Sequence, residues 1–471
     1  MVTLTLLREN IGRPWRLAPL LVQRIRSDSL LRNSVYMMSA TVINSLFGYL
    51  FWIVAAHLYP TGDIGLAAAL LSALTLTSAL SIMGLGTSLI QALPGSAPGR
   101  AWSLALNTRL VCSLLTGLGA GAVLVGALPL ISPHFSMVKD DPAYAVSLVF
   151  GVTIWSFTSV LDDVFIAERA AGKMLARDAT FGLFKNVLLV AFTIPAPLKA
   201  VGILDSSVAA SAASAVTGVM LVARLGRHYR PVLRGTIRQM PAAFSSSLGY
   251  HCISLGGVAP MYLLPLIITA RLSAADTAYF YTTWMIGGIF FIISPAVATS
   301  LFAEGSHTAA DLRLKVISSC SFITLLLVPA MLFLFFAGQY VIDVFGTNYA
   351  SHSVALLTIL IISAVPDAVT NVYVSVLRVK RKLKQAALLN IAMAMIALIL
   401  AWLLLPSLGV VGAGWAWLGA QTTGAAVVGI QVIAARQWHT RLVQTKRSRA
   451  ENEGGQSIDE DNLSTTPRMT S

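Results

Sequence analysis

The sequence predicts an all-α, polytopic membrane protein with about twelve transmembrane helices in two parallel six-helix lobes. Composition is the first observation: of 471 residues, 56% are hydrophobic and 11% are charged, against about 25% charged in soluble domains. The second is that stretches 33–62 and 64–99 contain no Lys, Arg, Asp or Glu, and about 20 apolar residues cross a bilayer. The third is a one-sided distribution of basic residues.

Twelve apolar segments are long enough to be transmembrane spans. In chain order they are Val35–Leu58, Ile64–Leu89, Leu104–Ile131, Tyr144–Ile166, Ala179–Pro195, Val208–Ala223, Ala242–Ala270, Tyr279–Ala303, Val316–Ile342, Val354–Leu377, Ala386–Leu405 and Val410–Ala435. The fifth is the weakest because Lys185 interrupts it, and the sixth is rich in Ala and Ser.

The basic residues predict the topology. If the N-terminus is cytoplasmic and the spans alternate, only Lys139, Lys199 and Arg271 of the 33 Lys and Arg fall in outer loops. This asymmetry follows the positive-inside rule, so we predict a multi-pass protein of the inner (plasma) membrane with both termini cytoplasmic. The net charge of +13 does not indicate nucleic acid as a partner, because the basic residues lie at the ends of apolar segments.

The chain divides into five predicted parts. Residues 1–32 form a basic cytoplasmic segment, 33–226 the N-terminal six-helix lobe, 227–241 a basic cytoplasmic linker, 242–436 the C-terminal six-helix lobe, and 437–471 a cytoplasmic tail. The tail turns polar and acidic from Glu451, a composition typical of disorder.

The two predicted lobes resemble each other weakly. Ala-His-Leu at 56–58, followed by Asp63, recurs as Ala-Arg-Leu at 270–272, followed by Asp276. Because each half holds an even number of spans, both halves insert in the same direction and the repeat axis runs along the membrane normal. Two parallel lobes of this kind usually enclose a central cavity with the substrate between them.

Catalytic signatures do not appear in the sequence. It contains no G-x-x-x-x-G-K-[ST], H-E-x-x-H or G-x-S-x-G pattern and no paired C-x-x-C. We therefore predict that the protein is not an enzyme, that it carries no cofactor and that it has no metal site. The three cysteines are far apart in apolar segments and are interpreted as small packing residues.

Ionisable residues inside spans are the strongest functional signal, since a charge at mid-bilayer is costly and is usually functional or paired. Arg109, Lys185 and Asn186 are candidate ligands for an anionic headgroup. Asp162 and Asp163 are candidate ion-coupling acids; the alternative is a structural ion pair with Lys185, because the fourth and fifth spans form a hairpin.

Asp367 is the candidate ion-coupling acid of the second half. It lies in the tenth span with no charged partner nearby in the sequence. The alternative interpretation is a hydrogen-bonded acid that lines a wet cavity.

The seventh span carries the candidate hinge, formed by Gly256, Gly257, Pro260 and Pro265. A proline removes a backbone donor and clashes with the preceding turn, so a kink is expected. Such a kink either moves during transport or is a static feature of the helix.

Several short patterns together resemble one known family. Arg-Asn-Ser at 32–34 opens the first span, and Leu-Tyr-Pro-Thr-Gly-Asp-Ile-Gly follows it at 58–65. Met-Gly-Leu-Gly at 83–86 ends the second span, and Leu-Gly-Val-Val-Gly-Ala-Gly at 408–414 opens the twelfth. Spread over residues 32–435, this pattern resembles the oligosaccharide flippases of the multidrug/oligosaccharidyl-lipid/polysaccharide exporter superfamily, also described as polysaccharide or lipopolysaccharide biosynthesis proteins.

The resemblance implies a flippase/MATE-like, V-shaped pair of six-helix lobes that work by alternating access. The implied substrate is a polyprenyl-diphosphate-linked oligosaccharide, moved from the cytoplasmic to the outer leaflet for cell-surface polysaccharide assembly. The implied partners are this lipid-linked oligosaccharide, membrane lipids and other polysaccharide-assembly proteins.

Two other functions remain open. One is a cation-coupled antiporter of small molecules or drugs from the same superfamily. The other is a membrane-embedded polysaccharide polymerase or ligase, which is less favoured because such enzymes usually need a large outer loop and none of the predicted outer loops exceeds about a dozen residues.

Overall fold

The computed structural model describes residues 29–193, 199–232, 235–245, 248–307 and 312–434, all helices and short connections. The N-terminal group comprises α3 (Ser29–Leu58), α4 (Thr61–Ile82), α5 (Leu85–Ala92), α6 (Arg100–Ile131), η1 (Pro133–Phe135), α7 (Met137–Asp140), α8 (Pro142–Ala167), α9 (Ala171–Ala191), α10 (Ala200–Ala223) and α11 (Thr236–Ser245). The C-terminal group comprises α12 (Leu248–Arg271), α13 (Ala274–Gly287), α14 (Phe290–His307), α15 (Leu312–Asp343), α16 (Thr347–Val379), α17 (Leu383–Leu408) and a last helix, Val411–Ala434.

Most of these helices are long and apolar enough to cross a bilayer. Among the described residues nine helices meet this criterion, and the bent pair α13 and α14 makes a tenth. The exposed side chains of these helices are largely aliphatic or aromatic, as expected for helices that face lipid tails. The predicted all-α polytopic fold class is therefore confirmed.

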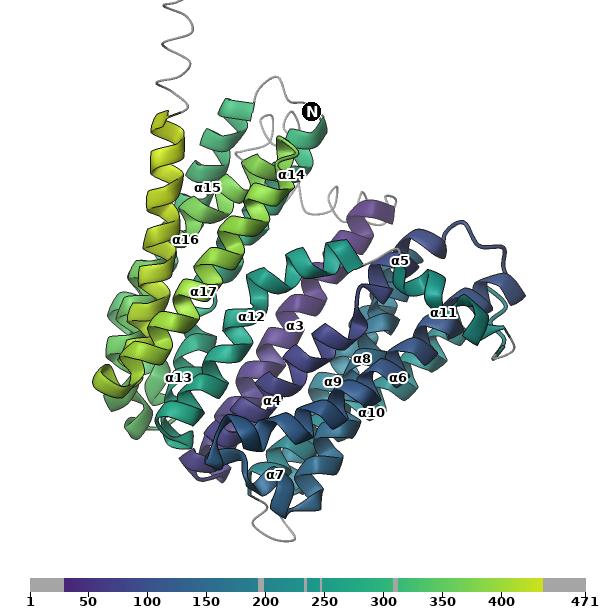
Figure 1. The fold of residues 1–471 in the computed structure, drawn as a ribbon, viewed down its shortest axis with the longest axis horizontal. Helices are drawn as coiled ribbons and strands as arrows, with labels where there is room; N and C mark the ends of the chain where they lie inside the picture. The colour runs from purple at the N-terminus through teal and green to yellow at the C-terminus, as the bar shows by residue number, and fades with distance from the viewer. Residues whose placement is uncertain (1–28, 194–198, 233–234, 246–247, 308–311, 435–471) are drawn as a thin grey trace, which may run out of the picture.

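The helices form two groups that diverge like the arms of a V. Figure 1 shows the arms meeting near α4, α12 and α13 and separating toward the end that carries α5, α11 and the last turns of α14. We call the first end the narrow end. The other is the basic end, because its connections hold Arg100, Arg169, Arg224, Arg227, Arg230 and residues 380–384.

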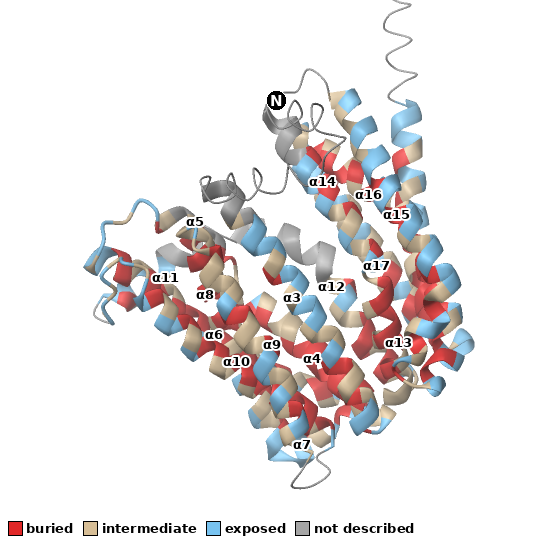
Figure 2. Ribbon diagram, turned by 180° about the vertical axis from the view of Figure 1, so that it is seen from behind, coloured by how far each residue is buried: buried red, intermediate tan, exposed pale blue. Residues whose placement is uncertain are grey.

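A close contact between helices joins the two groups at the narrow end. A Cβ atom added to Gly65 on α4 would overlap the carbonyl group of Ala274, the first residue of α13. Only glycine permits this approach of one backbone to the other. Figure 2 shows buried residues inside each arm and where α4 and α13 lie close together.

The second span of each arm is broken. In the first arm Met83 and Gly84 both adopt left-handed backbone conformations, with φ of 46° and 77°, and this separates α4 from α5. In the second arm α13 and α14 meet at a bend of 42° beside Gly288. The sequence predicts one continuous span in each case; the structure corrects this, because the residues that end α4 cannot continue a right-handed helix.

The connection between the arms is fixed to the N-terminal arm over its first part. The amide N–H of Gly99 donates to the carbonyl of Arg227 at 2.8 Å. The side chain of Asn107 donates to the carbonyls of Arg230 and Val232, at 3.2 and 3.1 Å. Helix α11 then packs against α6. This part of the predicted linker therefore follows the surface of the first arm.

Replacing Gly65 with Leu is expected to force α4 and α13 apart. The new side chain would overlap the Ala274 backbone, and overpacking of this kind costs about 1–3 kcal/mol. We expect a lower apparent melting temperature of the purified protein in detergent. Gly62→Leu is the matched control on the same helix, since a Cβ at Gly62 meets nothing within 4 Å. Equal melting temperatures of the two variants would contradict the proposal that this contact holds α4 and α13 together.

Candidate functional site

A cavity of about 820 Å³ lies between the two arms. The N-terminal arm lines it with α3, α4 and α9, and the C-terminal arm lines it with α12, α13, α14, α16, α17 and the last helix. It reaches toward the basic end as far as Arg378 in the last turn of α16. Because both arms contribute, any relative movement of the arms changes its shape.

Aromatic side chains form much of the cavity wall. They are Tyr49, Trp52, Tyr262, Tyr281, Trp284, Phe291 and Trp417. Several of these rings contact each other: Trp284 packs edge-on against Trp417 with ring centroids 4.9 Å apart, and Trp52 lies 4.8 Å from Tyr281. Trp52 and Tyr281 come from different arms, as do Tyr49 and Met285, whose carbonyl accepts a hydrogen bond from the Tyr49 hydroxyl at 2.8 Å.

Two cations from opposite arms line the same cavity. Lys185 comes from α9 and Arg378 from α16. The Lys185 Nζ atom lies 3.8 Å from the centroid of the Phe51 ring, a cation–π contact. Across the described ranges neither cation makes an ion pair with a carboxylate. Both can therefore attract an anionic group that enters the cavity.

The predicted tenth span ends at Leu377, so the prediction leaves Arg378 among the basic residues of the following loop. The structure corrects this, because α16 continues to Val379. A long basic side chain in the last turn of a span can reach back along the helix. In the sequence, however, such a residue looks like one of the basic loop residues that determine topology.

The other candidate headgroup ligands lie apart from the cavity lining. The Arg109 guanidinium donates from Nε to the Ser88 hydroxyl and from Nη1 to the Ala105 carbonyl, both at 3.0 Å, and so lies between α5 and α6. The Asn186 amide donates to the carbonyls of Phe47 and Gly182, at 3.1 and 2.8 Å, and ties α9 to α3.

Asp162 pairs with a residue that the sequence did not single out. The Arg177 guanidinium lies 2.8 Å from Asp162 and 2.5 Å from the neighbouring Asp178. The expected partner was Lys185, and this pairing is corrected. The cause is the start of α9 at Ala171, eight residues before the predicted span, which brings Arg177 into the helix and buries it.

Asp163 lies against the break between α4 and α5. Its carboxylate occupies the space that a Cβ atom at Gly86 would fill, in the first turn of α5. A negative charge is favourable beside the unpaired N–H groups of a helix start. The Met-Gly-Leu-Gly pattern at 83–86 therefore has two structural roles, a left-handed turn and room for this acid.

Asp367 lines the central cavity and is buried, with 5% of its surface exposed. The Ser294 hydroxyl donates to its carboxylate at 2.5 Å, and the Asn371 side chain donates to Ser294 at 3.3 Å. Its neighbours are therefore neutral hydrogen-bonding groups. This geometry agrees with a hydrogen-bonded acid in a cavity; the ion-coupling role stays a prediction.

The candidate hinge falls within α12. This helix runs from Leu248 to Arg271 through both Pro260 and Pro265, and Pro260 lines the cavity. Gly256 and Gly257 belong to the part of α12 whose packing lies outside the described residues. No group of three or more His, Cys, Asp or Glu that could hold a metal ion occurs among the residues that the structure describes.

Comparison with known proteins identifies the fold. No protein-family model and no curated protein sequence matches the chain. Among solved structures, the inward-facing conformation of a multidrug resistance MATE family transporter of the MOP superfamily matches with a TM-score of 0.63 and 14% identity, over 86% of this chain and 99% of that one.

Two further structures match at somewhat lower scores. An outward-facing multidrug resistance MATE family transporter gives a TM-score of 0.58 and 18% identity, over 88% of this chain and 98% of that one. A MATE structure in complex with MaL6 gives 0.57 and 16%, over 87% and 97%. The chain therefore has the fold of MATE transporters, and the expected MATE-like arrangement is confirmed.

Arg177→Gln is expected to destabilise the protein by about 3–5 kcal/mol, because it leaves two carboxylates without their shared cation. Adding Asp178→Asn should recover part of the loss. Chemical denaturation of the purified protein would measure both. Arg227→Gln is the control: this partly exposed guanidinium pairs with a single carboxylate, Glu168, which keeps its hydrogen bond from Trp102 Nε1 at 2.8 Å, so its loss should cost less. Similar losses of stability in the two Arg variants would contradict the prediction that the buried cluster stabilises the protein more than the Arg227–Glu168 pair does.

Gly86→Ala is expected to lower the melting temperature, because the new methyl group would displace the Asp163 carboxylate. Removing the carboxylate as well, in the double variant Gly86→Ala/Asp163→Ala, should restore melting, because the overlapping atoms at Gly86 all belong to that carboxylate. Gly119→Ala on α6 is the matched control, since a Cβ there meets nothing within 4 Å. If Asp163→Ala fails to rescue Gly86→Ala, the steric explanation is wrong.

Proposed function

We propose that this protein is an alternating-access transporter whose substrate occupies the cavity between the two arms. The observation that carries the proposal is the construction of that cavity: both arms line it, and at the narrow end α4 and α13 close it through the Gly65 contact. A rocking movement of the arms would open the narrow end and close the basic end.

The basic end corresponds to the cytoplasmic side in our topology. The positive-inside distribution supports this orientation, and the arms diverge at the same end (Figure 1). The higher TM-score with the inward-facing neighbour than with the outward-facing one, 0.63 against 0.58, favours the same state. The conformation described here is then the cytoplasm-open state.

For the substrate, the cavity chemistry favours an amphiphile with an anionic headgroup. Lys185 and Arg378 supply positive charge from opposite arms, and the aromatic wall can stack on sugar rings or other flat groups. A lipid-linked oligosaccharide has both features: its diphosphate would contact the cations, its sugars the aromatic rings. Its lipid tail would remain between helices.

A small-molecule or drug exporter is the second candidate, and the comparisons favour it. The matching solved structures are multidrug resistance transporters, and about 820 Å³ is a size that suits drug-like ligands. In this alternative Asp367 would bind the coupling cation. Asp162 and Asp163 are the corresponding candidates in the first arm.

The experiment compares the leaflet distribution of lipid-linked oligosaccharides in cells with and without this protein. If the protein is a flippase, the intermediate accumulates on the cytoplasmic face of deficient cells and wild type reverses this. An unchanged distribution, together with increased sensitivity to toxic small molecules, would instead establish the exporter.

Lys185→Gln and Arg378→Gln are each expected to reduce transport of the anionic substrate at least about tenfold, because a charge-assisted contact contributes about 1.5–3 kcal/mol. Initial rates in proteoliposomes or complemented cells would measure the change. Lys382→Gln is the control, an exposed cation beyond the end of α16 that does not line the cavity. Wild-type rates in both cavity variants would exclude an anionic headgroup at this site.

A further inference from the structure

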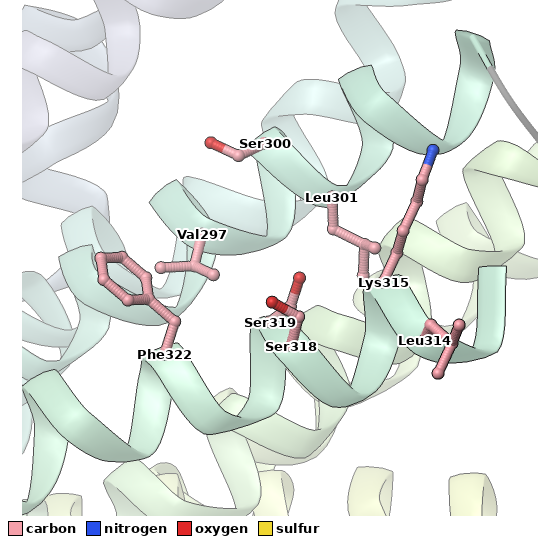
Figure 3. Close-up of a pocket in the computed structure, with 8 residues that line it drawn as sticks. All are labelled: Val297, Ser300, Leu301, Leu314, Lys315, Ser318, Ser319 and Phe322. Atoms are coloured by element: carbon pink, nitrogen blue, oxygen red, sulfur yellow. The ribbon is translucent and has the colours of Figure 1, made fainter. Parts of the chain in front are cut away.

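A second cavity lies on the far side of α14 from the central one. It holds about 370 Å³ between α14 and α15 (Figure 3). Helix α14 turns Thr299 toward the central cavity and Val297 and Ser300 toward this second space. The second cavity is therefore separate from the substrate path, and nothing in the proposed function uses it.

Beyond Leu314 at its rim, the α15 wall of this cavity changes from polar to apolar along the helix. Lys315, Ser318, Ser319 and Phe322 all line the cavity and lie at the i, i+3, i+4 and i+7 positions that share one helix face. Lys315 is nearest the basic end, the two hydroxyls follow about one turn later, and the aromatic ring is deepest in the bilayer. This order matches that of a phospholipid, with its charged headgroup above its acyl chain.

The two hydroxyls at the centre of the cavity are available to a ligand. Farther along α15, Ser321 and Thr324 donate to the carbonyls of Ile317 and Cys320, at 3.0 and 2.9 Å, as hydroxyls in membrane helices commonly do. Within the described ranges Ser318 and Ser319 make no such bond. Figure 3 shows both hydroxyls directed into the space between the helices.

The surroundings restrict the kind of ligand. Leu314 and Phe322 are 65% and 51% exposed, and Leu325 below them is 67% exposed, so the cavity opens on a lipid-facing surface. A ligand must therefore combine an apolar chain with a group that accepts hydrogen bonds from hydroxyls near a cation. Lys315 also makes a contact inside the protein, so the serines are the main donors and Lys315 adds electrostatic attraction.

We propose that this cavity binds the phosphate headgroup of one anionic phospholipid from the leaflet at the basic end. Phosphate oxygens accept from Ser318 and Ser319, and the acyl chain runs along Phe322 into the bilayer. The phosphate has only acceptors and so matches a set of donors. This inference is independent of the transported substrate.

The test is native mass spectrometry of the full-length protein in detergent, titrated with dioleoylphosphatidylglycerol or with dioleoylglycerol, which has the same acyl chains and no phosphate. Wild type should retain one phosphatidylglycerol at concentrations about tenfold below those needed for dioleoylglycerol. Equal retention of the two lipids would overturn the proposal, and this comparison requires no variant.

The double variant Ser318→Ala/Ser319→Ala should bind phosphatidylglycerol about tenfold more weakly, as expected for lost hydrogen bonds to a charged group. Ser319→Trp, which fills the cavity, should abolish the preferred site. Ser321→Ala/Thr324→Ala is the matched control, because it removes two hydroxyls of the same helix that bond to their own backbone. If the first double variant binds like wild type, or the control loses binding equally, the site is wrong.

Discussion

The contact of α4 with α13 is the constraint on which the arrangement of the molecule depends. It joins the starts of the second spans of the two arms, where Gly65 brings one backbone against the carbonyl of Ala274. With the arms held together at the narrow end, their other ends diverge, and the space between them becomes the central cavity. The aromatic contacts between arms, such as Trp52 with Tyr281, line that space at the level where the divergence begins.

The fold could be predicted from the sequence because its cause is compositional. Long uncharged stretches and basic loops on one side reflect the cost of placing charges in hydrocarbon, and they are visible without any structure. The breaks within the second spans were missed, since a Met-Gly pair or a Gly-Gly pair also occurs in continuous membrane helices. Only the packing around such a pair decides whether the helix is broken or continuous.

The candidate site was predicted in part. Lys185 and Asp367 were identified because an unpaired charge in an apolar run is conspicuous, and both line the central cavity. Arg177 was missed because the neighbouring charges at 173, 177 and 178 resemble a loop, although two carboxylates compensate the buried guanidinium. Arg378 was missed for a related reason. A basic residue at the end of a span usually indicates the cytoplasmic side, and the sequence does not show that its side chain extends to the cavity.

Acids at matching places in the two arms make different contacts. Asp63 and Asp276 occupy matching places near the starts of α4 and α13. Asp276 belongs to a local cap, with its N–H donating to the Ser273 hydroxyl, whereas Asp63 accepts from the distant N–H of Ala200 and ties α4 to α10. The buried acids differ similarly, since Asp162 has a cation and Asp367 has only neutral neighbours. Among the described residues, the acids of the first arm thus include a buried ion pair, whereas Asp367 of the second arm joins α16 to α14 through a neutral hydroxyl.

The attachment of the interlobe connection to the first arm has a mechanical consequence. Because the segment from Arg227 to Val232 is held by Gly99 and Asn107, it cannot act as slack when the arms move. Helix α11 packs against α6 as well, so the connection follows the first arm as far as Ser245, and α12 begins at Leu248. Any movement of one arm relative to the other must therefore be accommodated close to the start of α12, and lengthening the chain there would be a way to change its amplitude while leaving every lining residue in place.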